Sequence, residues 1–202
     1  MLGFASAFAR SQVARLVLAS RSPRRREILE ALGIAFEVAD PNVPEATEGE
    51  PDRLVVENAR RKAKAGLTVA PVGTVVLGAD TEVVLDDRVL GKPADEAAAL
   101  AHLEALSGRS HTVLTGVALL GASGPGEEPE RTGVARSVVT FRDLDAATLH
   151  TYLASGEWRD RAGAYAIQGL GSILIERLEG DFSNVVGLPV PLLLDLAPEL
   201  FA

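Results

Sequence analysis

Residues 16–29 read LVLASRSPRRREIL, an apolar strand pattern that breaks at a serine-containing turn and continues as a helix. Pro23 suits the first position of that helix, where no backbone N–H is needed. Arg24, Arg25 and Arg26 then fall in the first turn, where positive charge opposes the helix dipole. Because free N–H groups and guanidinium groups together favour a bound anion, the pattern predicts a phosphate site. A solvated basic helix start is the simpler alternative.

The composition of the 202 residues limits the classes of function. The net charge of -8 argues against a surface for nucleic-acid polymers, so the arginine-rich turn favours a small anionic ligand. The chain has no cysteine, which excludes disulfides, thiol nucleophiles and cysteine-ligated zinc. No run approaches the roughly 18 consecutive apolar residues that a membrane span needs. We therefore expect a cytoplasmic protein without a membrane partner.

The first fourteen residues differ from the rest. They are mildly apolar and lack the basic start of a secretion signal. We expect residues 1–14 to be an N-terminal tail, or a start codon assigned too early, ahead of a single domain over residues 15–202.

Apolar runs alternate with helical periodicities in the first half of the chain, and long strands dominate the second half. This order predicts an α/β protein with a mixed sheet. The Gly- and Pro-rich residues 121–130 join two long strands, so we interpret them as a surface hairpin loop without chemistry. The expected strands are 15–19, 34–38, 74–79, 82–85, 88–90, 110–120, 132–142 and 172–177. The expected helices run from Pro23 to Gly33 with Ser22 as N-cap, then over 52–69, 95–106, 145–154 with Asp145 as N-cap, and 189–200. Asp86 and Asp87 are expected to form a hairpin turn.

Three further clusters could carry chemistry. Asp80 is placed at the end of an apolar strand, where a carboxylate can hold Mg²⁺ or accept a proton from water, or simply cap a turn. Lys92 lies between Gly91 and Pro93, where it is either a charge for phosphate or an ordinary surface lysine. In the Gly-rich run 161–171, Gln168 offers both a donor and an acceptor for a base edge, or the run is only a turn before a strand.

Six segments in order resemble the Maf family of nucleotide pyrophosphatases. They are LASRSPRRREIL (18–29), NARRKAKAG (58–66), GADTEVVLDDRVLGKP (78–93), SGRSHTVLTGVAL (107–119), RAGAYAIQGLGS (161–172) and EGDFSNVVGLP (179–189). The resemblance implies a long, curved mixed sheet flanked by helices, with two lobes around a central cleft, as in Maf and ITPase-like folds. It also implies hydrolysis of a nucleoside triphosphate to the monophosphate and pyrophosphate, a divalent cation (Mg²⁺ or Mn²⁺) and a homodimer.

Family roles carried over by position make Asp80 the catalytic proton acceptor. The resemblance ties Arg24, Thr81 and Gln168 to substrate choice, and it places Ser20, Arg25, Lys62 and Lys92 toward phosphate. Glu45 aligns with an acidic residue that helps Asp80 to hold the metal. The AGAYAIQG segment is similar to the branch that hydrolyses dTTP and UTP. A pyrophosphatase for 7-methyl-GTP or another modified nucleotide is the enzymatic alternative, and a non-catalytic nucleotide sensor in septum formation is the non-enzymatic one.

Overall fold

The computed structural model describes residues 15–121 and 130–201, so the predicted tail at 1–14 and nearly all of the predicted loop at 121–130 lie outside the described residues. The strands are β1 (Arg15–Ala19), β2 (Phe36–Ala39), β3 (Thr74–Leu85), β4 (Arg88–Leu90), β5 (Ser110–Gly121), β6 (Glu130–Phe141) and β7 (Ile175–Glu179). The helices are α1 (Pro23–Ala31), α2 (Pro51–Leu67), α3 (Glu96–Leu106), α4 (Ala146–Ser155), α5 (Phe182–Val186) and α6 (Val190–Leu196).

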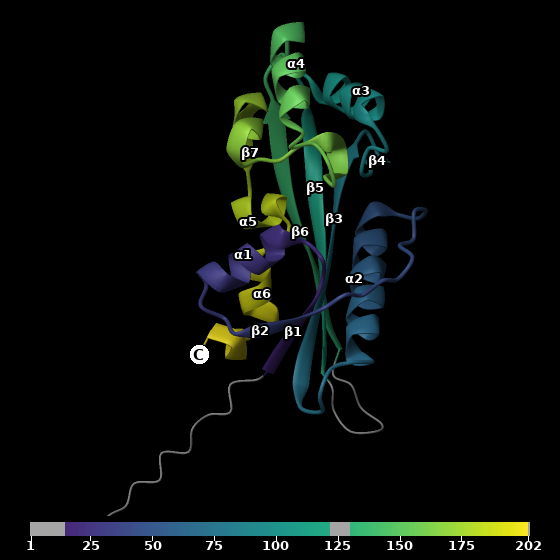
Figure 1. Cartoon of the computed structure of the whole chain (residues 1–202), viewed down its shortest axis with the longest axis vertical. Helices are drawn as coiled ribbons and strands as arrows, with labels where there is room; N and C mark the ends of the chain where they lie inside the picture. Colours follow the sequence, from purple (N-terminus) through teal and green to yellow (C-terminus); the bar gives the residue numbers. More distant parts are fainter. Residues whose placement is uncertain (1–14, 122–129, 202) are drawn as a thin grey trace, which may run out of the picture.

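Within these ranges the strands form one seven-stranded mixed sheet that runs along the molecule (Figure 1). The strand order is β2-β1-β3-β5-β6-β7, and β4 adds to β3. β1 pairs in parallel with β2 and β3, whereas the remaining pairs are antiparallel. The predicted α/β fold with a mixed sheet is therefore confirmed.

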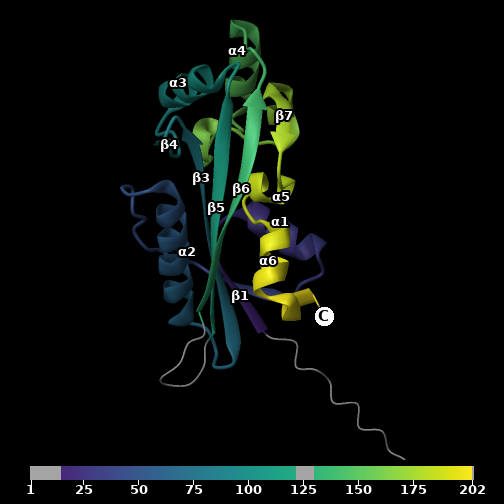
Figure 2. The same ribbon diagram turned by 180° about the vertical axis from the view of Figure 1, so that it is seen from behind.

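The apolar run of β1 is continuous because both faces of this strand are buried. Leu16 and Leu18 pack on one face with residues of α1 and α6, while Val17 and Ala19 pack on the other face with residues of α2. The view from behind shows α2 on one side of the sheet and α5 and α6 on the other (Figure 2). Side chains that alternate along one strand thus contribute to two separate cores.

A third apolar cluster lies at the other end of the sheet. It gathers Leu103 and Leu106 of α3 with Tyr152 of α4, Phe141 of β6 and Tyr165. These residues form the core of an upper lobe in Figure 1, above the lower lobe that α1, α2 and α6 build around β1. The upper of the two predicted lobes therefore contains this third cluster, and the lower lobe contains the two clusters on either side of β1.

The backbone of helix α2 packs directly against two positions of the sheet that have no side chain. A Cβ atom at Gly78 of β3 would lie 2.1 Å from the carbonyl oxygen of Ala59, and one at Gly116 of β5 would lie 2.4 Å from that of Val55. Both oxygens belong to the α2 backbone, so the two glycines set the distance between helix and sheet.

Several local predictions are confirmed. Asp86 and Asp87 form the β3–β4 turn with φ angles of 48° and 62°, a conformation that aspartate tolerates. The Asp145 carboxylate caps α4 by accepting a hydrogen bond from the Thr148 N–H at 2.8 Å. The elements at 34–38, 52–69 and 132–142 are present with their ends shifted by one or two residues.

Other local predictions are wrong. The strand predicted over 172–177 begins only at Ile175, because the glycine-rich residues before it form a 3-10 helix, Gly169–Leu174. The helix predicted over 189–200 divides into α6 and a 3-10 helix, Pro198–Phe201. Ser22 is the N-cap residue of α1 as predicted, although its side chain makes no capping hydrogen bond. The described helices include none that is long and apolar enough to cross a membrane.

Candidate active site

The site lies where β3 loses one of its neighbours. β1 ends at Ala19, which pairs with Gly78, whereas β3 continues to Leu85. Asp80 therefore lies within β3 rather than at its end, which corrects the sequence-based prediction. The chain leaves β1 through the turn at Ser20, and so a cleft with a volume of about 450 Å³ opens beside the uncovered part of β3.

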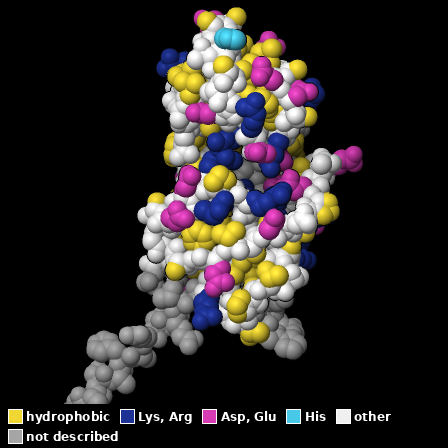
Figure 3. All heavy atoms as spheres, in the orientation of Figure 1, with side chains coloured by type: hydrophobic (Ala, Val, Ile, Leu, Met, Phe, Trp, Pro, Cys, Tyr) yellow, Lys and Arg dark blue, Asp and Glu magenta, His cyan; other side chains and the backbone are white. Residues whose placement is uncertain are grey.

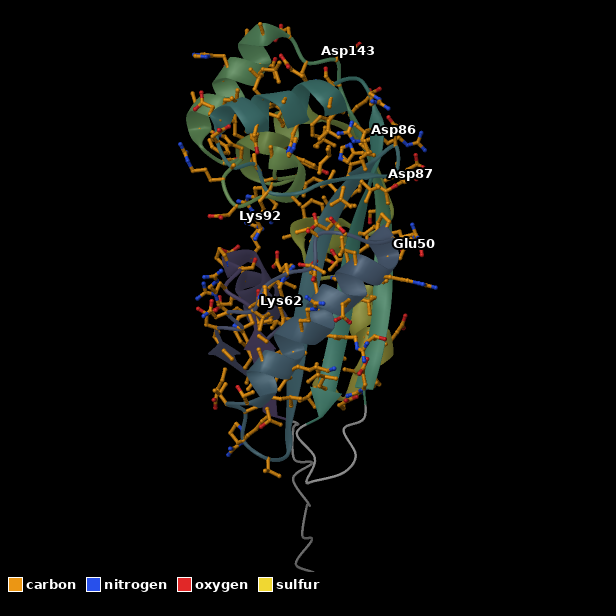
Figure 4. All side chains as sticks on the ribbon, turned by 90° about the vertical axis from the view of Figure 1, so that its right-hand side faces the viewer. Glu50, Lys62, Asp86, Asp87, Lys92 and Asp143 are labelled. Atoms are coloured by element: carbon orange, nitrogen blue, oxygen red, sulfur yellow. The ribbon has the colours of Figure 1, made fainter. Side chains whose placement is uncertain are left out.

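The residues that the resemblance assigned to the site all line this one cleft: Ser20, Arg24, Arg25, Glu45, Lys62, Asp80, Thr81, Lys92 and Gln168. Arg26, the third arginine of the predicted phosphate site, is not among the lining residues and donates instead to the Arg21 carbonyl. Lys and Arg side chains gather with acidic ones across the middle of the face shown in Figure 3. Figure 4 shows Lys62 on α2 in the lower half and Lys92 above it, on the segment that follows β4. The cleft is thus lined from both lobes.

Asp80 is the most enclosed carboxylate of the cleft, with 4% of its surface exposed. One of its oxygens accepts a hydrogen bond from Lys62 Nζ at 2.6 Å, and the other accepts one from Asn58 Nδ2 at 3.1 Å. The same Lys62 ammonium lies 2.6 Å from a carboxylate oxygen of Glu45. Burial alone would raise the pKa of Glu45, but Lys62, with further help from Lys92, lowers it overall. One ammonium group therefore bridges two carboxylates.

Asn58 is a site residue to which the sequence analysis gave no role. Its side chain donates to the Ala46 carbonyl at 3.0 Å and accepts from the Ala46 N–H at 2.7 Å, while it also donates to Asp80. It thereby fixes the segment that carries Glu45 beside Asp80. The sequence signal that could have identified Asn58 is its position four residues before Lys62, which places both side chains on one face of α2.

Arg25 is fixed by the protein itself. It is 8% exposed, and it donates from Nε to the Gly187 carbonyl at 2.7 Å, from Nη1 to Ser20 Oγ at 3.2 Å and from Nη2 to Thr81 Oγ1 at 3.1 Å. Burial lowers its pKa to about 10, against the opposing charge of Asp80, so it stays cationic at neutral pH. The neighbouring Arg24 is only partly buried.

Glu82 is a second residue that sequence analysis missed. It follows Asp80 by two positions along β3, so both side chains lie on the same face of the strand. One of its carboxylate oxygens is buried without a hydrogen-bond partner among residues 15–121 and 130–201. Burial, followed by the negative charges of Asp80 and Glu45, raises the pKa of Glu82 to about 8.

The oxygen-rich donor set fits a hard divalent cation. Asp80 and Glu45 offer carboxylate oxygens, which Mg²⁺ and Mn²⁺ prefer. No group of three or more His, Cys, Asp or Glu residues suited to a metal occurs in the part of the chain that the structure describes. Mg²⁺ commonly binds through one or two carboxylates and completes its shell with substrate phosphates and water, so this arrangement suits it.

The run predicted to approach a ligand extends from Arg161 along the cleft. Gly163 needs its left-handed conformation (φ 64°), and an added Cβ would lie 2.9 Å from a Val83 methyl group. The Tyr165 hydroxyl lies 2.8 Å from His111 Nε2, which ties the run to β5. Gln168 lies exposed at the edge of the cleft, where its amide is available to a ligand.

Comparison with known proteins places the chain in a family. The family model described as "Maf-like protein" matches residues 15–200. A dTTP/UTP pyrophosphatase of Deinococcus radiodurans is 46% identical, over 90% of this chain and 91% of the relative. One of Anaeromyxobacter sp. is 49% identical, over 87% of this chain and 84% of the relative. The solved structure of a HAM1 protein from Coxiella burnetii is 23% identical, with a TM-score of 0.44 over 62% of this chain and 73% of that one. On the family match and these identities, the chain belongs to the Maf-like protein family.

Proposed function

We propose that this protein hydrolyses dTTP and UTP between the α and β phosphates. The nucleoside monophosphate and pyrophosphate are the products. The names of the two relatives support the choice of substrate. The observation that carries the proposal is the convergence of an enclosed carboxylate, Asp80, with Lys62, Lys92 and Arg24 on one cleft. Cations placed beside a carboxylate suit a polyphosphate that is attacked by water.

The cations have separate tasks in this proposal. Lys92 and Arg24 hold the triphosphate from opposite lobes, and Arg25 lends its charge from its fixed position beside Ser20. Asp80 orients a water molecule and accepts its proton as the water oxygen bonds to the α-phosphorus. The bond between that phosphorus and the bridging oxygen breaks, and pyrophosphate leaves with the bond's electron pair. Positioning and electrostatic stabilisation supply most of the rate in such chemistry.

Asp80 and Glu45 are the residues that would hold a divalent cation. When bound, Mg²⁺ or Mn²⁺ neutralises charge on the phosphate oxygens. The Lys62 ammonium already bridges both carboxylates, so it competes with the cation for the same oxygens. In this proposal, a phosphate of the substrate draws the ammonium away when it binds.

Replacement of the proposed base tests the function. Asp80→Asn keeps the shape of the side chain but removes the proton acceptor, so we expect pyrophosphate release to be lost while nucleotide binding stays measurable. Asp87→Asn, in the exposed β3–β4 turn, is the matched control and should be fully active. The substrates are UTP, dTTP, CTP and 7-methyl-GTP, each with Mn²⁺. Saturable binding without turnover would favour the nucleotide-sensor alternative, and preferential cleavage of 7-methyl-GTP would favour the other branch.

The remaining features of the proposal rest on the family resemblance and the composition. We place residues 15–202 in one catalytic domain, expect a homodimer, and expect it to act in the cytoplasm without nucleic-acid or membrane partners. Light scattering of the purified chain tests the dimer, since a monomeric mass at micromolar concentration would contradict it.

A further inference from the structure

Thr81 follows Asp80 on β3, but its side chain lies on the opposite face of the strand. Its hydroxyl oxygen accepts a hydrogen bond from Arg25 Nη2 at 3.1 Å and lies 2.9 Å from the Thr115 hydroxyl. Thr115 is directly opposite on β5 and is fully buried. Thr81 also lines the cleft, so the direction of these bonds decides what its hydroxyl offers to a ligand.

The far end of this chain of hydrogen bonds sets the direction. The Thr115 hydroxyl lies 3.1 Å from the carbonyl oxygen of Asn184, which can only accept. The Asn184 side chain is itself anchored on Val113 and Ser137. Because a buried carbonyl without a donor is costly, Thr115 gives its one hydrogen to Asn184. The Thr115 oxygen can then only accept, and it accepts the hydrogen of Thr81.

The hydroxyl of Thr81 has consequently no hydrogen left for a ligand. Its oxygen has two lone pairs, and Arg25 occupies one of them. Toward the cleft Thr81 therefore presents only an acceptor. Phosphate oxygens are acceptors as well, so this position does not suit the triphosphate and fits an N–H or O–H group instead.

We infer that Thr115 is a positioning residue that orients the Thr81 hydroxyl, so that the Thr81 oxygen accepts the N3–H of a uracil or thymine base. The inference rests on the proposed function and deepens it. Uracil and thymine share this imide hydrogen, whereas cytosine has an unprotonated nitrogen at the same place. A site that must receive a hydrogen rejects a base that lacks one more strongly than an apolar pocket could.

The test compares substrates and variants by their kcat/KM for pyrophosphate release. For the unmodified protein, we expect 3-methyl-UTP and CTP to fall below UTP by roughly tenfold or more, and 3′-deoxy-UTP to stay near UTP. Thr115→Val removes the hydroxyl at nearly constant volume, so the UTP/CTP ratio should fall by roughly tenfold, mainly through KM for UTP. Thr115→Ser keeps the hydroxyl and should retain the ratio. Thermal melting reports whether each variant folds.

The outcomes separate the inference from the function on which it depends. Hydrolysis of UTP and 3-methyl-UTP at equal rates would overturn the inference and leave the pyrophosphatase proposal intact. If kcat/KM falls only for 3′-deoxy-UTP, the Thr81 oxygen accepts from the sugar hydroxyl, and this result would also overturn the inference. If UTP and dTTP are not hydrolysed at all, both proposals fail. The comparison of UTP with 3-methyl-UTP uses the unmodified protein, so equal rates for the two would overturn the inference even if Thr115→Val does not fold.

Discussion

Substitution of Gly78 by alanine should separate α2 from the sheet and misplace the candidate base. The added Cβ would lie 2.1 Å from the Ala59 carbonyl oxygen and 2.7 Å from the Ala63 nitrogen, whereas ordinary contact begins at 3.4 Å. Both atoms are helix backbone, which cannot rotate away as a side chain would. The helix must therefore move by more than about 1 Å to reach ordinary van der Waals contact, and it carries Asn58 and Lys62 with it.

We expect Gly78→Ala to lower both stability and activity. Overpacking of a core costs about 1–3 kcal/mol, and for a domain of this size each kcal/mol lowers the melting temperature by about 2–4 °C. A misplacement of about 1 Å can cost roughly 100-fold in rate, because the hydrogen bonds from Lys62 and Asn58 to Asp80 are 2.6 and 3.1 Å long in the native protein. Thermal denaturation and pyrophosphate release with UTP measure the two effects.

Gly91→Ala is the matched control, since an added Cβ there meets nothing within 4 Å. It should leave the melting temperature and kcat unchanged. The reasoning is refuted if Gly78→Ala matches the unmodified protein in both measurements. If only stability falls and kcat stays the same, the position of α2 does not control Asp80.

Two other perturbations test the charges. Lys62→Met leaves Asp80 and Glu45 without their shared ammonium, so the nucleotide-free variant should bind Mn²⁺ more tightly by calorimetry while it releases pyrophosphate more slowly; unchanged or weaker Mn²⁺ binding would contradict the competition. Burial lowers the pKa of His111 to about 4, below that of an unfolded histidine at about 6.5. The unfolded chain therefore takes up a proton first as the pH falls, and the free energy of unfolding should drop by roughly 3 kcal/mol between about pH 6.5 and 4. His111→Gln should remove this part of the pH dependence in urea denaturation, and an unaltered slope would show that the folded-state pKa of His111 is not depressed.

Local signals in the sequence predicted most of the fold. The apolar runs of β1 and β3 are recognisable because both strands pack between helix layers, and the Asp86–Asp87 turn and the Asp145 cap are recognisable because their side chains and backbone act within a few residues. Residues 172–174 were assigned to the strand that follows them, but they complete a 3-10 helix that begins at Gly169. The conformational freedom of the glycines at 169 and 171 left no local signal for that helix.

The motifs alone predicted the family and the candidate site residues that they contain, because the motifs are contiguous and their order is visible in the chain. The tertiary structure alone decided how those residues meet. β1 has five residues and β3 has twelve, and this difference in length opens the cleft beside Asp80. Arg25 turns inward, and Asn58 and Thr115 become part of the site, because each contacts groups distant in sequence. Such contacts depend on the packing of whole elements and leave no periodic or local pattern in the chain.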